Sequence, residues 1–319
     1  MGALALAGVF SGEEEPAQPL RPETTEGDTS RGEGIGDEDA VERPDMKTIQ
    51  VGGRPTAIAA GEGSVWIADS FSDEASAIRP RHRGNPPPAH FALLGPAADV
   101  ATGYGGVWFA LPEQGTIERR DPSATASAGE QIPVDGFPSG IAAGGSSVWA
   151  VSESIVLRID PASGEVSDEI ELSGFGSGVA VGEGLLWVIV DNRELVRIDA
   201  STGEDVEEPI AVRDASNIAV GDGSAWLVSA SETVTGIDTG SLEAVGKPAR
   251  VRGALDVAVG EQAVWVTSSD RTVTRLDPTT GEIVGAPLPV GDEPVSVSVG
   301  EGAVWVANGG DGTVTRIEP

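Results

Sequence analysis

Seven tryptophans recur along most of the chain at nearly even spacing, each preceded by a small or branched apolar residue. Successive spacings are 42, 41, 38, 39, 39 and 40 residues. A period of this length that contains several strand-sized segments and no helical pattern is typical of β-propeller blades, and it is too long for leucine-rich or tetratricopeptide repeats. The tryptophans are Trp66, Trp108, Trp149, Trp187, Trp226, Trp265 and Trp305.

The unit around Trp265 indicates how four strands, a to d, follow one another in a blade. Segment 253–259 turns back into 263–267, a loop leads to 272–276, and the turn Asp-Pro-Thr-Thr-Gly leads to 282–290. In such a turn proline presets φ, aspartate hydrogen-bonds the backbone that follows it, and glycine accepts a positive φ. Each unit is therefore predicted to form four antiparallel strands.

The last unit ends at Pro319, just after its third strand 313–317, and so lacks strand d. Residues 46–51, which precede the first complete unit, resemble the missing strand. Sharing one sheet between the two ends of the chain closes the ring and leaves no unpaired edge. We therefore predict an all-β fold for residues 46–319: a seven-bladed β-propeller of four-stranded antiparallel blades, closed by the N-terminal strand.

The N-terminal region divides into an apolar run, residues 1–10, and a polar segment, residues 11–45, rich in Glu, Gly, Thr and Pro. A membrane-spanning helix needs about 20 residues, and no basic segment precedes the run as in a signal peptide. We interpret 1–10 as the remnant of a membrane helix or signal core that begins upstream, or alternatively as a fortuitously apolar terminus. Segment 11–45 has too few apolar residues to offset the entropy of ordering and is predicted to be a disordered acidic linker.

The charge balance restricts the partners of the chain. Its formal net charge is −31, from 51 acidic and 20 basic residues, and such a field repels nucleic acids and anionic membrane surfaces. An unidentified small molecule or protein remains as partner, and contact with a membrane would come only through an upstream anchor. We expect the propeller to be a monomer. The absence of cysteine excludes disulfides, thiolate metal sites and cysteine nucleophiles.

The repeats resemble those of bacterial propellers of the YVTN and YncE type, as in segments 300–308 (GEGAVWVAN) and 312–317 (GTVTRI). They are also similar to the repeats of streptogramin (virginiamycin B) lyase. The resemblance covers all seven units and implies the fold, but such folds host unrelated activities. Similar repeats follow a membrane helix and an acidic linker in actinobacterial serine/threonine kinases, which implies an extracytoplasmic location.

In a propeller the a–b and c–d turns lie on one face, and the b–c and d–a loops surround the channel mouth on the other. Here the former are short and uniform, whereas the latter vary. Variable loops on a rigid frame usually carry binding, so we expect a ligand site there; the alternative is a solvated acidic rim. The candidate residues are Arg54, Asp69, Phe71, Asp191, Asn192, Asp214, Asn217, Asp256, Ser268 and Asn308.

Arginines recur at one place in strand c of five units. They could form an anion-binding ring, but we favour pairing of each guanidinium with a carboxylate of the following turn. For the tryptophans we expect packing between blades, because each ring covers a large apolar area. The arginines are Arg119, Arg158, Arg197, Arg275 and Arg316, and the expected partners are Asp121, Asp160, Asp199, Asp277 and Glu318.

The lyase resemblance implies a histidine base and a magnesium ion at the channel mouth. The only histidines, His82 and His90, lie in or beside the long c–d connection of the first unit, so no general base can be placed and no catalytic residue is assigned. Loop carboxylates could gather a calcium ion, but no EF-hand spacing occurs, and no cofactor is assigned. Arg79, Arg81 and Arg83 lie beside His82 and form a basic patch. This patch either contacts a partner or is simply an exposed loop.

We therefore hypothesise a non-enzymatic ligand-binding or sensor propeller displayed outside the cytoplasmic membrane as part of a receptor or kinase. The shortage of catalytic residue types and the variability of the loops favour this function. Two alternatives remain open: a C–O lyase similar to streptogramin lyase, and a protein-interaction scaffold that binds no small ligand.

Overall fold

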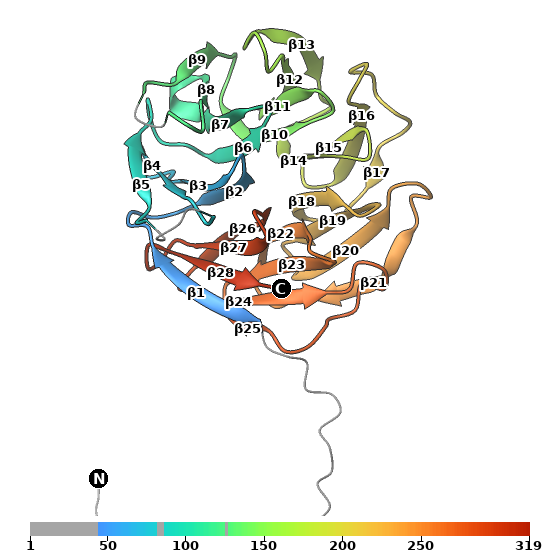
Figure 1. Cartoon of the computed structure of the whole chain (residues 1–319). Coiled ribbons are helices and arrows are strands. Elements are labelled where there is room, and N and C mark those ends of the chain that lie inside the picture. The colour runs from blue at the N-terminus through green and yellow to red at the C-terminus, as the bar shows by residue number, and fades with distance from the viewer. Residues whose placement is uncertain (1–43, 82–85, 125–126) are drawn as a thin grey trace, which may run out of the picture. The chain divides into compact units, whose positions relative to one another are not determined.

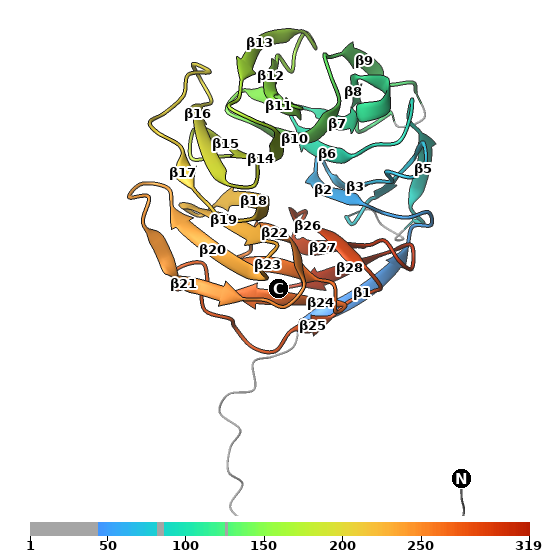
Figure 2. The same cartoon turned by 180° about the vertical axis from the view of Figure 1, so that it is seen from behind.

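The computed structural model describes residues 44–81, 86–124 and 127–319, so the predictions for residues 1–43 and for His82 and Arg83 lie outside the described residues. The described chain forms seven four-stranded antiparallel sheets. These sheets follow one another around a ring, with the first strand of each nearest the centre (Figures 1 and 2). The predicted seven-bladed β-propeller is therefore confirmed.

Strands a to d of each of the first six blades are consecutive in the chain and run from the channel outward. Blade 1 comprises β2 (Ala57–Gly61), β3 (Ser64–Ala68), β4 (Glu74–Ile78) and β5 (Ala89–Ala92). Blade 2 comprises β6 (Asp99–Gly103), β7 (Gly106–Leu111), β8 (Thr116–Arg120) and β9 (Glu130–Pro133), with a short 3-10 helix η1 (Pro112–Gln114) after β7. Blade 3 comprises β10 (Pro138–Gly144), β11 (Ser147–Ser152), β12 (Ile155–Ile159) and β13 (Val166–Glu171).

The outer strand d is much shorter in blades 4 and 6 than in blade 5. Blade 4 comprises β14 (Gly176–Gly182), β15 (Leu185–Val190), β16 (Glu194–Asp199) and β17 (Ile210–Ala211). Blade 5 comprises β18 (Ala215–Gly221), β19 (Ser224–Ser229), β20 (Thr233–Asp238) and β21 (Ala244–Arg250). Blade 6 comprises β22 (Ala254–Gly260), β23 (Ala263–Ser268), β24 (Thr272–Leu276) and β25 (Leu288–Pro289).

Blade 7 is completed by the N-terminal strand. It comprises β26 (Pro294–Gly300), β27 (Ala303–Asn308), β28 (Thr313–Glu318) and, as strand d, β1 (Asp45–Gln50). β1 pairs with β28 in an unbroken antiparallel register from Asp45↔Glu318 to Gln50↔Thr313, and the two lie side by side in Figure 1. The predicted closure is confirmed, with the strand beginning one residue earlier than expected.

Tryptophan packing joins the blades. The buried apolar residues form seven clusters, each shared by two neighbouring blades, and the cluster of blades 7 and 1 completes the circle. Every tryptophan is at most 1% exposed. Trp66, for example, packs against Val100 and Val107 of the next blade. The tryptophans are therefore structural, as predicted.

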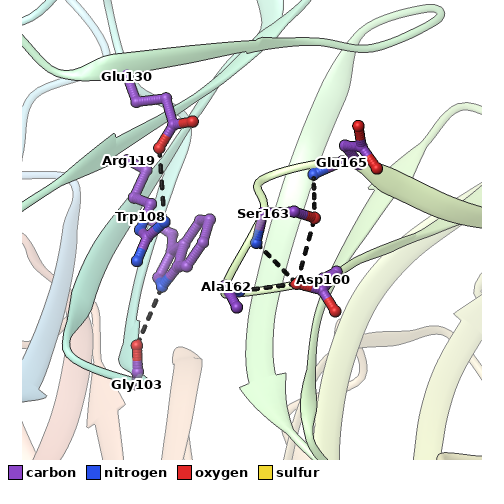
Figure 3. A network of polar contacts seen from close by, with 8 residues as sticks. All are labelled: Gly103, Trp108, Arg119, Glu130, Asp160, Ala162, Ser163 and Glu165. Carbon is purple, nitrogen blue, oxygen red and sulfur yellow. Dashed lines mark hydrogen bonds and ion pairs between the residues drawn. The ribbon is translucent and has the colours of Figure 1, made fainter.

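A glycine at the end of strand a allows this close packing. In five blades it accepts a hydrogen bond from the indole Nε1 of the tryptophan that follows, as Gly103 does from Trp108 at 3.1 Å (Figure 3). In all seven blades a Cβ on this glycine would lie no more than 3.2 Å from an atom of the next blade's inner strand. Any larger residue would therefore push two blades apart.

The c–d turns differ in one respect from the prediction. Asp160 Oδ1 accepts hydrogen bonds from the backbone N–H groups of Ser163 and Ala162 at 2.8 Å each, which lower the pKa of its carboxyl group (Figure 3). Hydrogen bonds from Ser201 and Thr202 likewise lower the pKa of Asp199 to about 2. The turn aspartates therefore bind their own turns rather than serving mainly as arginine partners.

The recurring arginines find other partners. Arg119 pairs with Glu130 at 3.4 Å and lies over the Trp108 ring, with Cζ 5.0 Å from the centroid (Figure 3). Arg158 lies over Trp149 in the same way. Among the described residues, only Arg316 pairs with the carboxylate that was predicted for it. Its guanidinium lies 2.6 Å from Glu318. In three of the five units the guanidinium therefore covers the tryptophan ring, and in a fourth Arg197 pairs with Glu207 at 3.2 Å.

The closure can be tested by truncation. Deleting residues 46–51 should lower the melting temperature by roughly 10 °C or more, because it leaves the outer edge of β28 without a partner strand. Each kcal/mol of lost stability shifts the melting temperature of a chain this size by about 2–4 °C. Deleting residues 12–38 should leave it nearly unchanged. Calorimetry of both truncations would measure the difference, and equal melting temperatures would contradict the role assigned to β1.

Candidate functional site

The ten candidate residues occupy different depths around the channel mouth. Some lie at the corner of blades 7 and 1, some on the rim of blades 4 and 5, some on the wall of the channel, and two beneath the surface. The corner holds Arg54, Asp69 and Phe71; the rim, Asp191, Asn192 and Asp214; the channel, Asn217 and Asp256; and the interior, Ser268 and Asn308.

At the corner of blades 7 and 1, Arg54 lies between a carboxylate and an aromatic ring. Its guanidinium is 2.8 Å from Glu293 Oε2, and its Cζ is 4.6 Å from the centroid of Phe71. Asp69 is buried and accepts hydrogen bonds from the backbone N–H of Arg54 at 2.9 Å and of Phe71 at 2.8 Å. Asp69 therefore fixes the loops, while Arg54 and Phe71 face solvent.

On the rim, polar side chains hold the loop that enters blade 4. Asp191 Oδ1 accepts a hydrogen bond from the backbone N–H of Phe175 at 3.0 Å, and Asn192 Oδ1 accepts one from Ser177 Oγ at 3.1 Å. Asp214 is exposed and has a positive φ of 49°. Asp191 and Asn192 thus position neighbouring residues, and of the three only Asp214 makes no side-chain hydrogen bond within the described chain.

Ser268 and Asn308 do not reach the rim, contrary to expectation. They are 1% and 0% exposed, and Asn308 Nδ2 donates to Thr313 Oγ1 and Thr315 Oγ1 at 3.0 Å each. Because side chains alternate along a strand, a residue three positions after the tryptophan points at the preceding blade. Neither residue therefore presents atoms to a ligand at the surface.

A polar cavity of about 320 Å³ occupies the centre of the ring. Asp99, Asn217 and Asp256 line it, and each lies nine residues before the tryptophan of its blade. Asp99 accepts hydrogen bonds from its neighbour Val100 at 2.8 Å and from Ile141 of blade 3 at 2.9 Å. Hydroxyl groups complete the polar lining: Thr56, Ser139, Ser177, Ser216 and Ser296.

Asp256 makes the equivalent bridge on another side of the channel. It accepts hydrogen bonds from the backbone N–H of Val257 and of Val297, the latter in blade 7, at 2.8 Å each, and from Asn217 Nδ2. Asp99 therefore bridges two blades, and Asp256 connects three, because Asn217 belongs to blade 5. The bridges satisfy N–H groups at the inner edge of the sheets that have no strand beside them.

The two carboxylates share an unfavourable electrostatic environment. Burial raises the pKa of Asp99 to about 7, and the charge of Asp256 adds to the effect. Burial also raises the pKa of Asp256 to about 6. No Lys, Arg or His is among the described residues that line the cavity, so no cationic side chain offsets the two charges.

Asp99 was not among the residues selected from the sequence. The signal was present, because Asp99 occupies the same position relative to Trp108 as Asp256 does relative to Trp265. Aligning the units on tryptophan, rather than searching the loops, would have identified it.

Among the residues that the structure describes, the exposed phenylalanines lie in loops of the channel-mouth face. Phe71, Phe137 and Phe175 are 67%, 60% and 64% exposed, whereas Phe91 and Phe109 are buried. Phe137 and Phe175 occupy the same position in the d–a loops that enter blades 3 and 4. Large exposed apolar side chains gathered on one face often mark an interaction site.

A second cavity, of about 480 Å³, lies over β5 and the outer strands of blade 2. Its lining includes the buried ion pair of Glu118 and Arg120, 2.6 Å apart, which replaces apolar or hydroxyl side chains at the equivalent positions of other blades. Glu118 accepts a hydrogen bond from Leu94 N, and Arg120 donates to Ser127 O. The pair therefore ties two connecting segments to the blade.

Of the two histidines, only His90 belongs to the residues that the structure describes. His90 lies on β5, the outer strand of blade 1, with Nδ1 2.9 Å from Ser76 Oγ. In residues 44–81, 86–124 and 127–319, no three His, Asp or Glu side chains come together as metal ligands. No helix in these same ranges is long and apolar enough to cross a bilayer.

The channel carboxylates predict a pH dependence of stability. Because their folded pKa values exceed those of the unfolded chain, their contribution to the free energy of unfolding should fall as pH rises from about 4 to 7, by about 1 to 4 kcal/mol for Asp99. Asp99→Asn should flatten this part of the profile. Denaturant unfolding of both proteins across this range measures the difference, and parallel profiles would contradict the raised pKa.

Comparisons with known proteins identify the fold alone. No known protein family matches the sequence, and no curated protein matches it either. Among solved structures, a chain of hydrazine synthase from Kuenenia stuttgartiensis superposes with a TM-score of 0.69 over 90% of this chain and 99% of that chain, at 16% sequence identity. At this identity the similarity establishes a shared propeller architecture and carries no functional information.

Proposed function

We propose that this protein is a non-enzymatic binding propeller whose channel-mouth face takes up a ligand or partner. The observation that carries the proposal is the exposure of Phe71, Phe137 and Phe175 on one face of a closed ring. Aromatic side chains supply large contact areas at low conformational cost, and they dominate many binding surfaces.

The opposite face supports this assignment by contrast. There the side chains of the a–b turns bind the next turn: Glu62 Oε1 accepts a hydrogen bond from Gly105 N at 3.0 Å, and Glu301 Oε1 accepts one from Gly63 N at 3.0 Å. Tyr104 does the same with its hydroxyl oxygen. Side chains of that face therefore hold neighbouring blades together, whereas the exposed phenyl groups of the channel-mouth face are available for contacts with a partner.

The proposal extends to display outside the cytoplasmic membrane, as the sensor part of a receptor or kinase of the YVTN or YncE repeat type. The apolar run 1–10 and the acidic segment 11–45 that follows support it. Fractionation of cells that express the chain with its native upstream sequence tests this location. Recovery wholly in the cytosol would refute it.

A screen by thermal shift tests the binding role. A ligand present at a hundredfold excess over its Kd contributes about 2.7 kcal/mol and should raise the melting temperature by roughly 5 to 10 °C. The shift should largely disappear in a variant carrying Phe71→Ser and Asp214→Ala, and should persist in a control with Glu282→Ala on the opposite face. If the thermal shift disappears only in the Glu282→Ala control, the ligand binds elsewhere. A screen without hits, together with a captured partner protein, favours a pure scaffold.

A second candidate function is acid–base catalysis in the channel, of the kind that a C–O lyase performs. It is favoured by Asp99, a carboxyl group with a pKa of about 7 that lines the same polar cavity as the carboxyl group of Asp256. A catalytic acid or base works best when its pKa lies near the operating pH.

Turnover of a streptogramin by the purified protein tests this second function. If Asp99 acts as the base, Asp99→Asn should lower kcat by about 100-fold or more, with the propeller still folded by circular dichroism. No turnover by the unaltered protein would leave binding as the function.

A further inference from the structure

Two adjacent loops on the channel-mouth face each present an exposed phenylalanine, and a third loop, which carries a carboxylate, contacts both of them. The loop into blade 3 presents Phe137, and the loop into blade 4 presents Phe175. Glu153, in the b–c loop of blade 3, contacts both. Its backbone oxygen accepts a hydrogen bond from Gly176 N at 2.8 Å, and a Cβ on Gly136 would lie 2.8 Å from its Oε2.

The backbone of these loops is fixed by hydrogen bonds. Phe175 exchanges two with Asp191, one through the aspartate carboxylate at 3.0 Å and one through its N–H at 2.8 Å. Ser152 Oγ donates to Asp135 O at 2.6 Å in the loop that precedes Phe137. The two rings are therefore presented by a preorganised frame, which reduces the entropy that a partner would have to overcome.

The corner of blades 7 and 1 shows how an exposed phenyl ring and a carboxylate are both contacted by one arginine in this protein. There a guanidinium, that of Arg54, lies against the Phe71 ring and pairs with Glu293. At blades 3 and 4 the rings and the carboxylate are present, but no guanidinium of the described chain lies over Phe137 or Phe175, and Glu153 forms no ion pair with a described residue.

We propose that Phe137, Phe175 and Glu153 form a docking site for an arginine-bearing segment of a partner protein. The guanidinium lies against a phenyl ring and pairs with the Glu153 carboxylate, as Arg54 does with Phe71 and Glu293. This inference rests on the proposed binding role of the channel-mouth face and names its partner.

Charge and shape select this occupant over others. A second copy of the chain carries the same net charge of −31, and residues 1–45 of this chain carry 12 acidic residues against three arginines, so the negative charge of the protein repels both. Neither phenylalanine lines either of the two cavities described above. An open surface of this kind suits a side chain held by an extended polypeptide better than a small molecule that must be enclosed.

Binding of a labelled peptide of alternating glycine and arginine to the full chain tests the site. Fluorescence anisotropy at about 150 mM salt, where the Debye length is about 8 Å, limits the contribution of distant charges. The variant with Phe137→Ser and Phe175→Ser should bind about tenfold more weakly, and Glu153→Gln about threefold more weakly. The same peptide with citrulline in place of arginine should bind little, because it keeps the shape but loses the charge.

Matched controls separate this site from bulk electrostatics. Glu169→Gln removes one exposed charge from the outer strand of the same blade, and Ile283→Ser removes an exposed apolar side chain from a c–d connection. Neither should change the affinity by more than about twofold, given that distant charges are screened. Equal weakening by Glu153→Gln and Glu169→Gln, or no binding by the unaltered chain, would overturn the inference.

The outcomes also distinguish this inference from the proposed function. If affinity falls with Phe71→Ser and Asp214→Ala but not with the variants at Phe137, Phe175 and Glu153, the face binds while the site named here is wrong. If only variants of the opposite face, such as Asp222→Ala, weaken binding, both proposals fall.

Discussion

The fit of each indole ring against the next blade is the contact on which the rest of the structure depends. Seven tryptophans lie in seven clusters that join neighbouring sheets, and glycines at the ends of the inner strands let those sheets approach. Because every blade is held by two neighbours, opening the ring would expose the apolar faces of two blades. β1 therefore contributes more than one strand's hydrogen bonds, since it completes the sheet through which blades 6 and 1 are joined.

The number of blades could be predicted because the same core contact recurs in every unit, whereas the outer strands could not. A nine-residue strand was expected over 282–290, but β25 covers only Leu288–Pro289. Gly285 with a φ of 72°, followed by Pro287, interrupts the ladder, because proline donates no hydrogen bond. Of the arginine partners only Glu318 was predicted correctly. A guanidinium on strand c can also pair with a carboxylate farther along the chain, as Arg119 does with Glu130, and the tryptophan face competes for it.

The sequence could predict which loops lie on the channel-mouth face, but only partly which of their side chains are exposed there. Loop variability located the channel mouth, but it cannot tell a side chain on the rim from one that points at a neighbouring blade. Asn308 was therefore selected although it is buried, and Asp99 was overlooked although it lines the channel. Both positions follow from the register relative to tryptophan, which determines whether a side chain faces the channel or a neighbouring sheet.

The channel and the rim differ in how far their side chains already take part in contacts that hold the fold. The carboxylates of Asp99 and Asp256 already accept backbone hydrogen bonds from two blades each, so a ligand that drew them away would expose N–H groups at the inner edges. The rings of Phe137 and Phe175 are exposed and make no comparable structural contacts. Covering them removes apolar surface from water without breaking a contact of the fold. Binding at the rim would therefore leave the propeller intact, and this energetic difference supports the rim over the channel as the proposed binding surface.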